Sequence, residues 1–91
     1  MQVKSTKVVH VKWIDSESVH GWQSKERFSS FSSDSINACE SIGILAFDGT
    51  DHIVIAQSVS DNCIDGNIKI PKCAIKSSKV IATVKMGQSL E

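Results

Sequence analysis

Hydrophobic and polar positions divide this 91-residue chain into short apolar runs joined by polar connections. The longest apolar unit consists of the runs at 42–47 and 53–59, which flank an Asp48-Gly49 dipeptide. Asp-Gly between two hydrophobic runs is a strong signal for a β-hairpin. We therefore predict a central hairpin around which the rest of the chain is organised.

The two strands of this hairpin differ in their pattern. Gly43 lies inside the first run and predicts a bend or bulge, as small barrels use to turn corners. Alternation places Leu45 and Phe47 on the same face as Gly43. The run at 53–59 is apolar on both faces, which suits burial on two sides or a subunit contact.

The segment at 7–15 alternates between apolar and polar residues, which predicts a strand. Its Val9, Val11 and Trp13 face the expected core. Three further elements follow the hairpin: a short strand at 68–70 that Pro71 ends, one helical turn at 72–75, and a last strand at 80–85.

A serine-rich connection at 16–35 separates the first strand from the hairpin and contains Trp22, Phe28 and Phe31. Ser24 is a suitable N-cap for a short helical turn. We expect the aromatic residues to fold this loop back onto the sheet, with Trp22 at least half covered. Five short strands and one long loop predict an all-β, mainly antiparallel fold, a small five-stranded barrel.

Length and composition limit the function. Residues 1–89 suit a single small domain, and Leu90-Glu91 reads as a vector-derived remnant. A domain this small often gains stability by forming a homo-oligomer. The formal net charge is zero, which removes the general argument for nucleic-acid binding. However, every charged residue at 34–65 is acidic and every one at 69–85 is basic, so neighbouring strands either neutralise each other or present a basic face.

The three cysteines are Cys39, Cys63 and Cys73, an odd number without a C-x-x-C pair. This pattern indicates reduced, non-catalytic thiols and a cytoplasmic location. The first residues lack the apolar segment of a signal peptide, and no run is long enough to span a membrane.

No motif predicts a catalytic, cofactor or metal site. Residues 61–72 follow a calcium-loop spacing in part, but Cys63 and Lys72 occupy positions that need oxygen ligands. Histidines and cysteines show no zinc spacing, and no nucleophile elbow or phosphate loop is present. A Cys/His pair is the one arrangement that would suit an enzyme, and we rank it third among the functions.

Two resemblances follow from the residues. The strand with Gly43, Phe47 and Asp48 resembles the Sm-like barrels of bacterial RNA chaperones, although Ile70-Pro71-Lys72 stands where that family has a glycine. This resemblance implies that the expected barrel is of the SH3-like or Sm-like kind. Nearly the whole chain resembles a group of small uncharacterised proteins encoded by phages and prophages. The residues that carry this second resemblance are Val11, Trp13, Asp15, Gly21, Trp22, Ile42, Gly43, Leu45, Ala56, Gln57 and the segment 70–75.

These observations leave two leading hypotheses. The first is a phage- or prophage-type accessory protein that acts without catalysis by binding another protein of host or phage, with Trp22, Phe28 and Phe31 as the binding residues. The second is a weak binder of RNA or single-stranded nucleic acid that uses Lys69, Lys72, Lys76 and Lys79.

Overall fold

The computed structural model describes residues 4–86, so the expected vector remnant at 90–91 lies outside the described residues. The elements in chain order are β1 (Lys4–Ile14), α1 (Lys25–Ser33), β2 (Ala38–Asp48), β3 (His52–Ala56), β4 (Ser58–Val59), β5 (Ile64–Asp65), β6 (Ile68–Pro71), the 3-10 turn η1 (Lys72–Ala74) and β7 (Ile75–Met86). The predicted hairpin is β2–β3, the helical turn after Pro71 is η1, and the short helix after Ser24 is α1. Each of these local predictions is confirmed.

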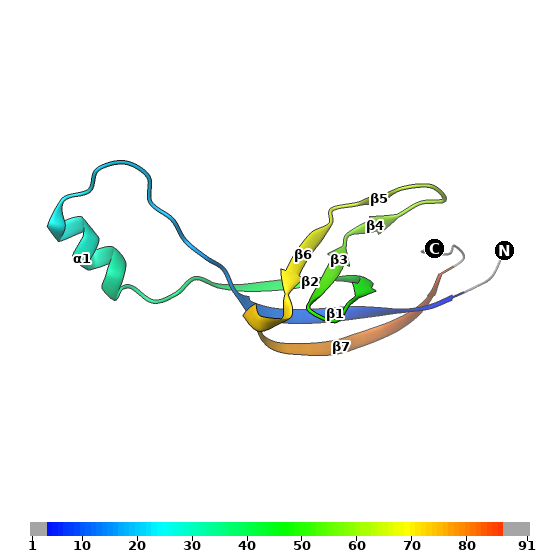
Figure 1. Ribbon diagram of the computed structural model, residues 1–91. Helices are drawn as coiled ribbons and strands as arrows, with labels where there is room; N and C mark the ends of the chain where they lie inside the picture. Colours follow the sequence, from blue (N-terminus) through cyan, green and yellow to red (C-terminus); the bar gives the residue numbers. More distant parts are fainter. Residues whose placement is uncertain (1–3, 87–91) are drawn as a thin grey trace.

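Five strands form one antiparallel sheet in the order β6-β3-β2-β1-β7. β4 and β5 pair separately, as a ribbon that continues the β3 and β6 strands outward (Figure 1). The mainly antiparallel β class is therefore confirmed. Within residues 4–86, however, the edge strands β6 and β7 do not pair, so the sheet is open and not a closed barrel.

The core lies on one face of this sheet. Its buried members are Val9, Val11, Ile53, Ile55 and Ile70. The register explains this set, because β1 contributes alternate residues and β3 sets Ile53 opposite Ile70. Trp13, Leu45, Ile68 and Ile75 pack against this core and stay partly exposed.

Gly43 permits a close approach between β2 and β3. A Cβ atom there would overlap Ile55 Cγ2 and lie 2.8 Å from the Ala56 carbonyl oxygen. The register shift of β2 falls between Leu45 and Phe47, beyond Gly43. The prediction that Leu45 and Phe47 share a face is wrong, because this irregularity leaves Leu45 on the core and pairs Phe47 with Val54, where it is half exposed.

The last strand is longer than predicted. β7 has 12 residues and pairs with β1 along its whole length, with register shifts between Val8 and Val9 and between Lys12 and Trp13. Within the described part of the chain no strand pairs with its other edge, and every residue from Lys76 to Lys85 is exposed. β7 is therefore a long edge strand with little burial.

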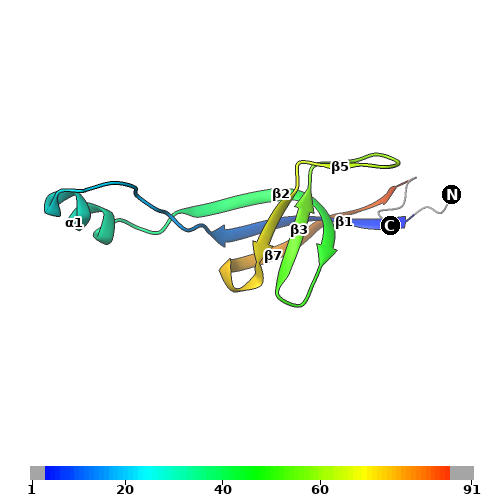
Figure 2. The same ribbon diagram turned by 45° about the horizontal axis from the view of Figure 1, so that its top comes forward.

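The molecule is elongated, with extents of 60 × 25 × 20 Å and a radius of gyration of 17.5 Å. A compact chain of this length would have a radius of gyration of about 12 Å. Figures 1 and 2 show the cause: α1 stands away from the sheet at one end of the long axis. The prediction that the serine-rich connection folds back onto the sheet is wrong, since none of the residues of α1 is buried.

Candidate functional site

The segment between β1 and β2 projects from the sheet as an arm, which we define as residues 15–37. Its base is held by one backbone hydrogen bond, in which the Asp15 N–H donates to the Asn37 carbonyl oxygen at 2.9 Å. Every residue from Ser16 to Ala38 is exposed. The arm therefore has no hydrophobic core of its own.

Local signals explain why α1 forms here. Ser24 caps the helix, because its Oγ accepts a hydrogen bond from the Arg27 N–H at 3.1 Å. Glu26 in the first turn complements the helix dipole. The hydroxyl groups of Ser32 and Ser33 donate to carbonyl oxygens four residues earlier, at 2.8 and 3.0 Å, so these serines remain compatible with a helix.

The apolar residues of the arm face solvent. Trp22 is fully exposed (103%), Ile36 is 67% exposed and Phe28 is 65% exposed. Phe31 is 41% exposed. The prediction that Trp22 is at least half covered is therefore wrong, because the loop that was to cover it does not return to the sheet.

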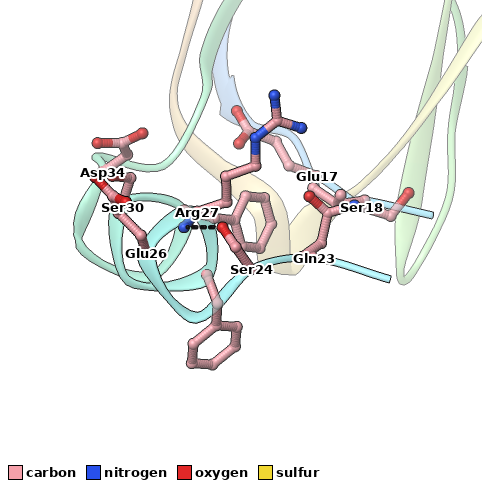
Figure 3. A pocket seen from close by; sticks show the side chains of 11 residues that line it. Glu17, Ser18, Gln23, Ser24, Glu26, Arg27, Ser30 and Asp34 are labelled. Atoms are coloured by element: carbon pink, nitrogen blue, oxygen red, sulfur yellow. Dashed lines mark hydrogen bonds between the residues drawn. The ribbon is translucent and has the colours of Figure 1, made fainter. Parts of the chain in front are cut away.

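Two hollows lie between α1 and the segments that lead to and from it. One has a volume of about 930 Å³ and the other about 520 Å³. Phe28 and Phe31 line both, together with Glu17 and Asp34. Figure 3 shows the larger hollow, with Arg27 on the helix, Ser24 at its N-cap and Glu17 on the connecting segment. The arrangement combines an apolar lining with a mainly acidic rim.

The candidate nucleic-acid residues are spread over different parts of the fold. Lys69 lies on β6 at one edge of the sheet, whereas Lys76 and Lys79 lie on β7 at the other. Lys72 Nζ is 2.9 Å from Asp48 Oδ1 in an ion pair. The four lysines are therefore not on one continuous strand, and one is already paired with a carboxylate.

The Asp51 and His52 side chains form a second polar contact, with 2.6 Å between Oδ1 and Nδ1. The hydrogen bond from His52, followed by the charge of that imidazole, lowers the pKa of the Asp51 carboxyl. The His52 ring also stacks on Phe47 with 5.3 Å between ring centres. The Asp51–His52 contact joins two neighbouring residues of the exposed β2–β3 turn. This position suits stabilisation of the turn better than catalysis.

Residues 4–86 contain no cluster of three or more His, Cys, Asp or Glu side chains that could hold a metal ion. The thiols of Cys39, Cys63 and Cys73 are free; Cys63 and Cys73 are exposed. In the same part of the chain, no helix has the length and apolar character needed to cross a membrane.

Sequence reasoning missed two groups of exposed apolar residues. In the arm these are Val19 and Ile36, which line the hollows with the phenylalanines. On β7 they are Val80, Ile81 and Val84, each 45–48% exposed. The run Val-Ile-Ala-Thr-Val at 80–84 was a usable signal, because both of its faces are apolar and only one can meet the core.

Comparison of the chain with protein-family models, with curated proteins and with solved structures finds no match. The resemblances to Sm-like barrels and to phage-encoded proteins thus stay predictions. The geometry of the arm is the basis for the function proposed below.

Proposed function

We propose that this protein is a non-enzymatic accessory protein of the phage or prophage type that binds another protein through its arm. The observation that carries the proposal is a nine-residue helix without a single buried residue, next to a fully exposed Trp22. Isolated helices shorter than about 12–15 residues are only marginally stable in water. A partner surface would supply the packing that the sheet does not.

The residue types of the arm suit this role. Trp and other aromatic residues supply much of the binding energy of protein interfaces, and an exposed Trp on a projecting segment is an effective anchor. Phe28 and Phe31 line hollows that can receive apolar side chains of a partner. Glu17, Glu26 and Asp34 at the same place favour a partner with basic residues around its apolar ones.

We also propose that the sheet is an SH3-like barrel left open. Its two edge strands, β6 and β7, are consecutive in the chain and are joined by η1 alone. Ile70 of β6 is a buried member of the core, and Ile75 of β7 packs against that core. One β6–β7 pairing would thus close the sheet, and this supports the predicted barrel topology.

Nucleic-acid binding is the second candidate. β1 and β7 together carry six lysines and no acidic residue, which favours contact with a polyanion. Two observations weigh against it. Lys72 is paired with Asp48, and Lys69 lies on the opposite edge strand from Lys76 and Lys79.

Site-specific photocrosslinking tests the proposal. A photoreactive phenylalanine analogue replaces Trp22 in the full chain, and a matched protein carries it at Ile42, which is 66% exposed but lies on the sheet. Both proteins are irradiated in a lysate of the cells in which the protein is made, once with and once without nuclease treatment. We expect specific protein adducts at position 22, absent at position 42 and unaffected by nuclease.

Equal adducts at both positions, or none, would contradict arm-mediated protein binding. Adducts that disappear after nuclease treatment would favour the nucleic-acid alternative.

A further inference from the structure

We infer that the arm binds the β7 strand of a second copy of this chain, an inference that rests on the proposed role of the arm in protein binding. Two exposed surfaces of the same molecule carry this inference. One is the arm, with its hollows and aromatic residues. The other is the exposed edge strand β7.

The chemistry of β7 suits the hollows of the arm. Its segment 80–84 reads Val-Ile-Ala-Thr-Val and is bounded by Lys79 and Lys85. Val80, Ile81 and Val84 are each about half exposed; β1 lies on one side of the strand, and no strand within residues 4–86 lies on the other. β7 thus presents an apolar centre between two positive charges.

The arm presents the opposite charge. It contains four acidic and two basic residues, a net charge of −2 with His20 neutral. Of these acids, Glu17, Glu26 and Asp34 line the larger hollow beside Phe28 and Phe31. β1 and β7, in contrast, hold six lysines and no acid. Apolar groups would meet apolar groups and acids would meet lysines, as electrostatically complementary interfaces require.

The arm cannot make this contact within its own chain. The hydrogen bond from Asp15 to Asn37 holds the base of the arm as an extension of β1 and β2, and Figure 1 shows α1 pointing away from the sheet. A copy turned end for end would bring each arm alongside the sheet of the other copy. This arrangement closes as a symmetric pair with two equal contacts.

The exposed aromatic area is sufficient to contribute substantially to such a pair. Given their exposed fractions, Trp22, Phe28 and Phe31 would bury roughly 300–500 Å² per arm. Two arms therefore approach half of the about 1,200–2,000 Å² that a stable interface buries. The apolar residues of β7 add to this from the other side of each contact.

Measuring the mass of the purified full chain by light scattering and sedimentation, over a wide range of concentrations, tests the inference. We expect a dimer of twice 9.9 kDa. Two double variants reverse the charges: Glu17→Lys with Glu26→Lys on the arm, and Lys79→Glu with Lys85→Glu on β7. Each should weaken the dimer about tenfold or more, because like charges then face each other. The combined quadruple variant should regain most of the affinity.

Lys69→Glu is the matched control, because Lys69 is exposed on the opposite edge strand β6. It should leave the dimer unchanged. Urea midpoints equal to that of the unmodified protein show that each variant is folded.

A monomer at all concentrations overturns the inference, as does a dimer that neither charge reversal weakens or that the quadruple variant fails to regain. The photocrosslinking result is read separately. A monomeric protein that still forms adducts at position 22 with a different protein refutes the second copy as partner and leaves the proposed function standing. A monomeric protein that forms no adducts at position 22 contradicts both the second copy as partner and the proposed function.

Discussion

The two tryptophans allow a direct comparison of the sheet with the arm. Trp13 packs against the core, and its indole N–H donates to Ser41 Oγ at 3.0 Å. Trp22 is fully exposed on the arm. Trp13→Ala and Trp22→Ala are therefore the same chemical change in two environments.

The expected losses of stability differ strongly. Replacing a buried aromatic residue by Ala costs about 3–5 kcal/mol, and Trp13 belongs at the lower end because it is partly exposed. That figure of about 3 kcal/mol includes roughly 1 kcal/mol for the lost hydrogen bond to Ser41. A domain of this size with few buried residues has a total stability of about 5 kcal/mol. Trp22→Ala should change the free energy of unfolding by less than about 0.5 kcal/mol.

Urea unfolding followed by far-UV circular dichroism measures both changes without relying on tryptophan fluorescence. With a urea slope of about 1 kcal/mol per molar, Trp13→Ala should lower the midpoint by roughly 2–3 M, and Trp22→Ala by less than about 0.5 M. The fluorescence of each variant gives an internal check. In Trp13→Ala, where Trp22 is the remaining tryptophan, the emission should be that of a solvated indole in both the folded and the unfolded protein. Equal midpoint losses, or a nearly unchanged melt for Trp13→Ala, would refute the placement of the two side chains.

Three further predictions concern other parts of the molecule. Thiol titration without reductant should find three free thiols in the denatured protein; fewer than three would reveal a disulfide or a bound metal. In the folded protein, the exposed Cys63 and Cys73 should react before Cys39. His52→Ala, which removes both the hydrogen bond and the imidazole charge, should raise the pKa of Asp51 towards its usual value of 3.8, as read by NMR titration. Because the folded-state pKa is lowered, the stabilisation by this pair is present above 3.8 and is lost as the pH falls through the folded-state value. An unchanged pKa would exclude the imidazole as the cause. If the lysines of β6, η1 and β7 bind single-stranded nucleic acid, three or four phosphate contacts give a slope of about −2 to −3 for log binding constant against log salt concentration. We expect no such steep, micromolar binding of an oligonucleotide. Binding with this slope that is abolished by charge reversal at the β7 lysines would establish the nucleic-acid alternative.

Several elements could be predicted because their signals act between residues close in sequence. Ser24 caps α1 because its Oγ accepts a hydrogen bond from the N–H of Arg27, three residues later. Asp48-Gly49 joins β2 to β3, and the turn is closed by a hydrogen bond from the Gly49 N–H to the His52 carbonyl oxygen at 2.9 Å. Alternation also placed Val9 and Val11 in the core.

The facing of Phe47 could not be read from alternation. A single irregularity between Leu45 and Phe47 reverses the facing of every residue that follows it in the strand. No residue type in that strand signals where the irregularity lies. The sequence named Trp22, Phe28 and Phe31 as candidate binding residues but did not predict their setting. They were expected to fold the loop back onto the sheet, whereas all three are exposed on the arm. That expectation assumed that apolar residues always find a partner in their own chain.

By itself, then, the sequence determined the antiparallel β class, the central hairpin, the short capped helix and the aromatic residues of the arm. The tertiary structure decided that the sheet stays open between β6 and β7 and that the arm stands away from it. Caps, turns and alternating patterns are local, and each is set by residues a few positions apart. Closure of a sheet and docking of an arm depend instead on contacts between distant segments, whose gain must exceed the entropy lost in ordering them. Here β1 and β2 lead into the arm, so that its aromatic residues lie beyond the reach of their own core and stay exposed.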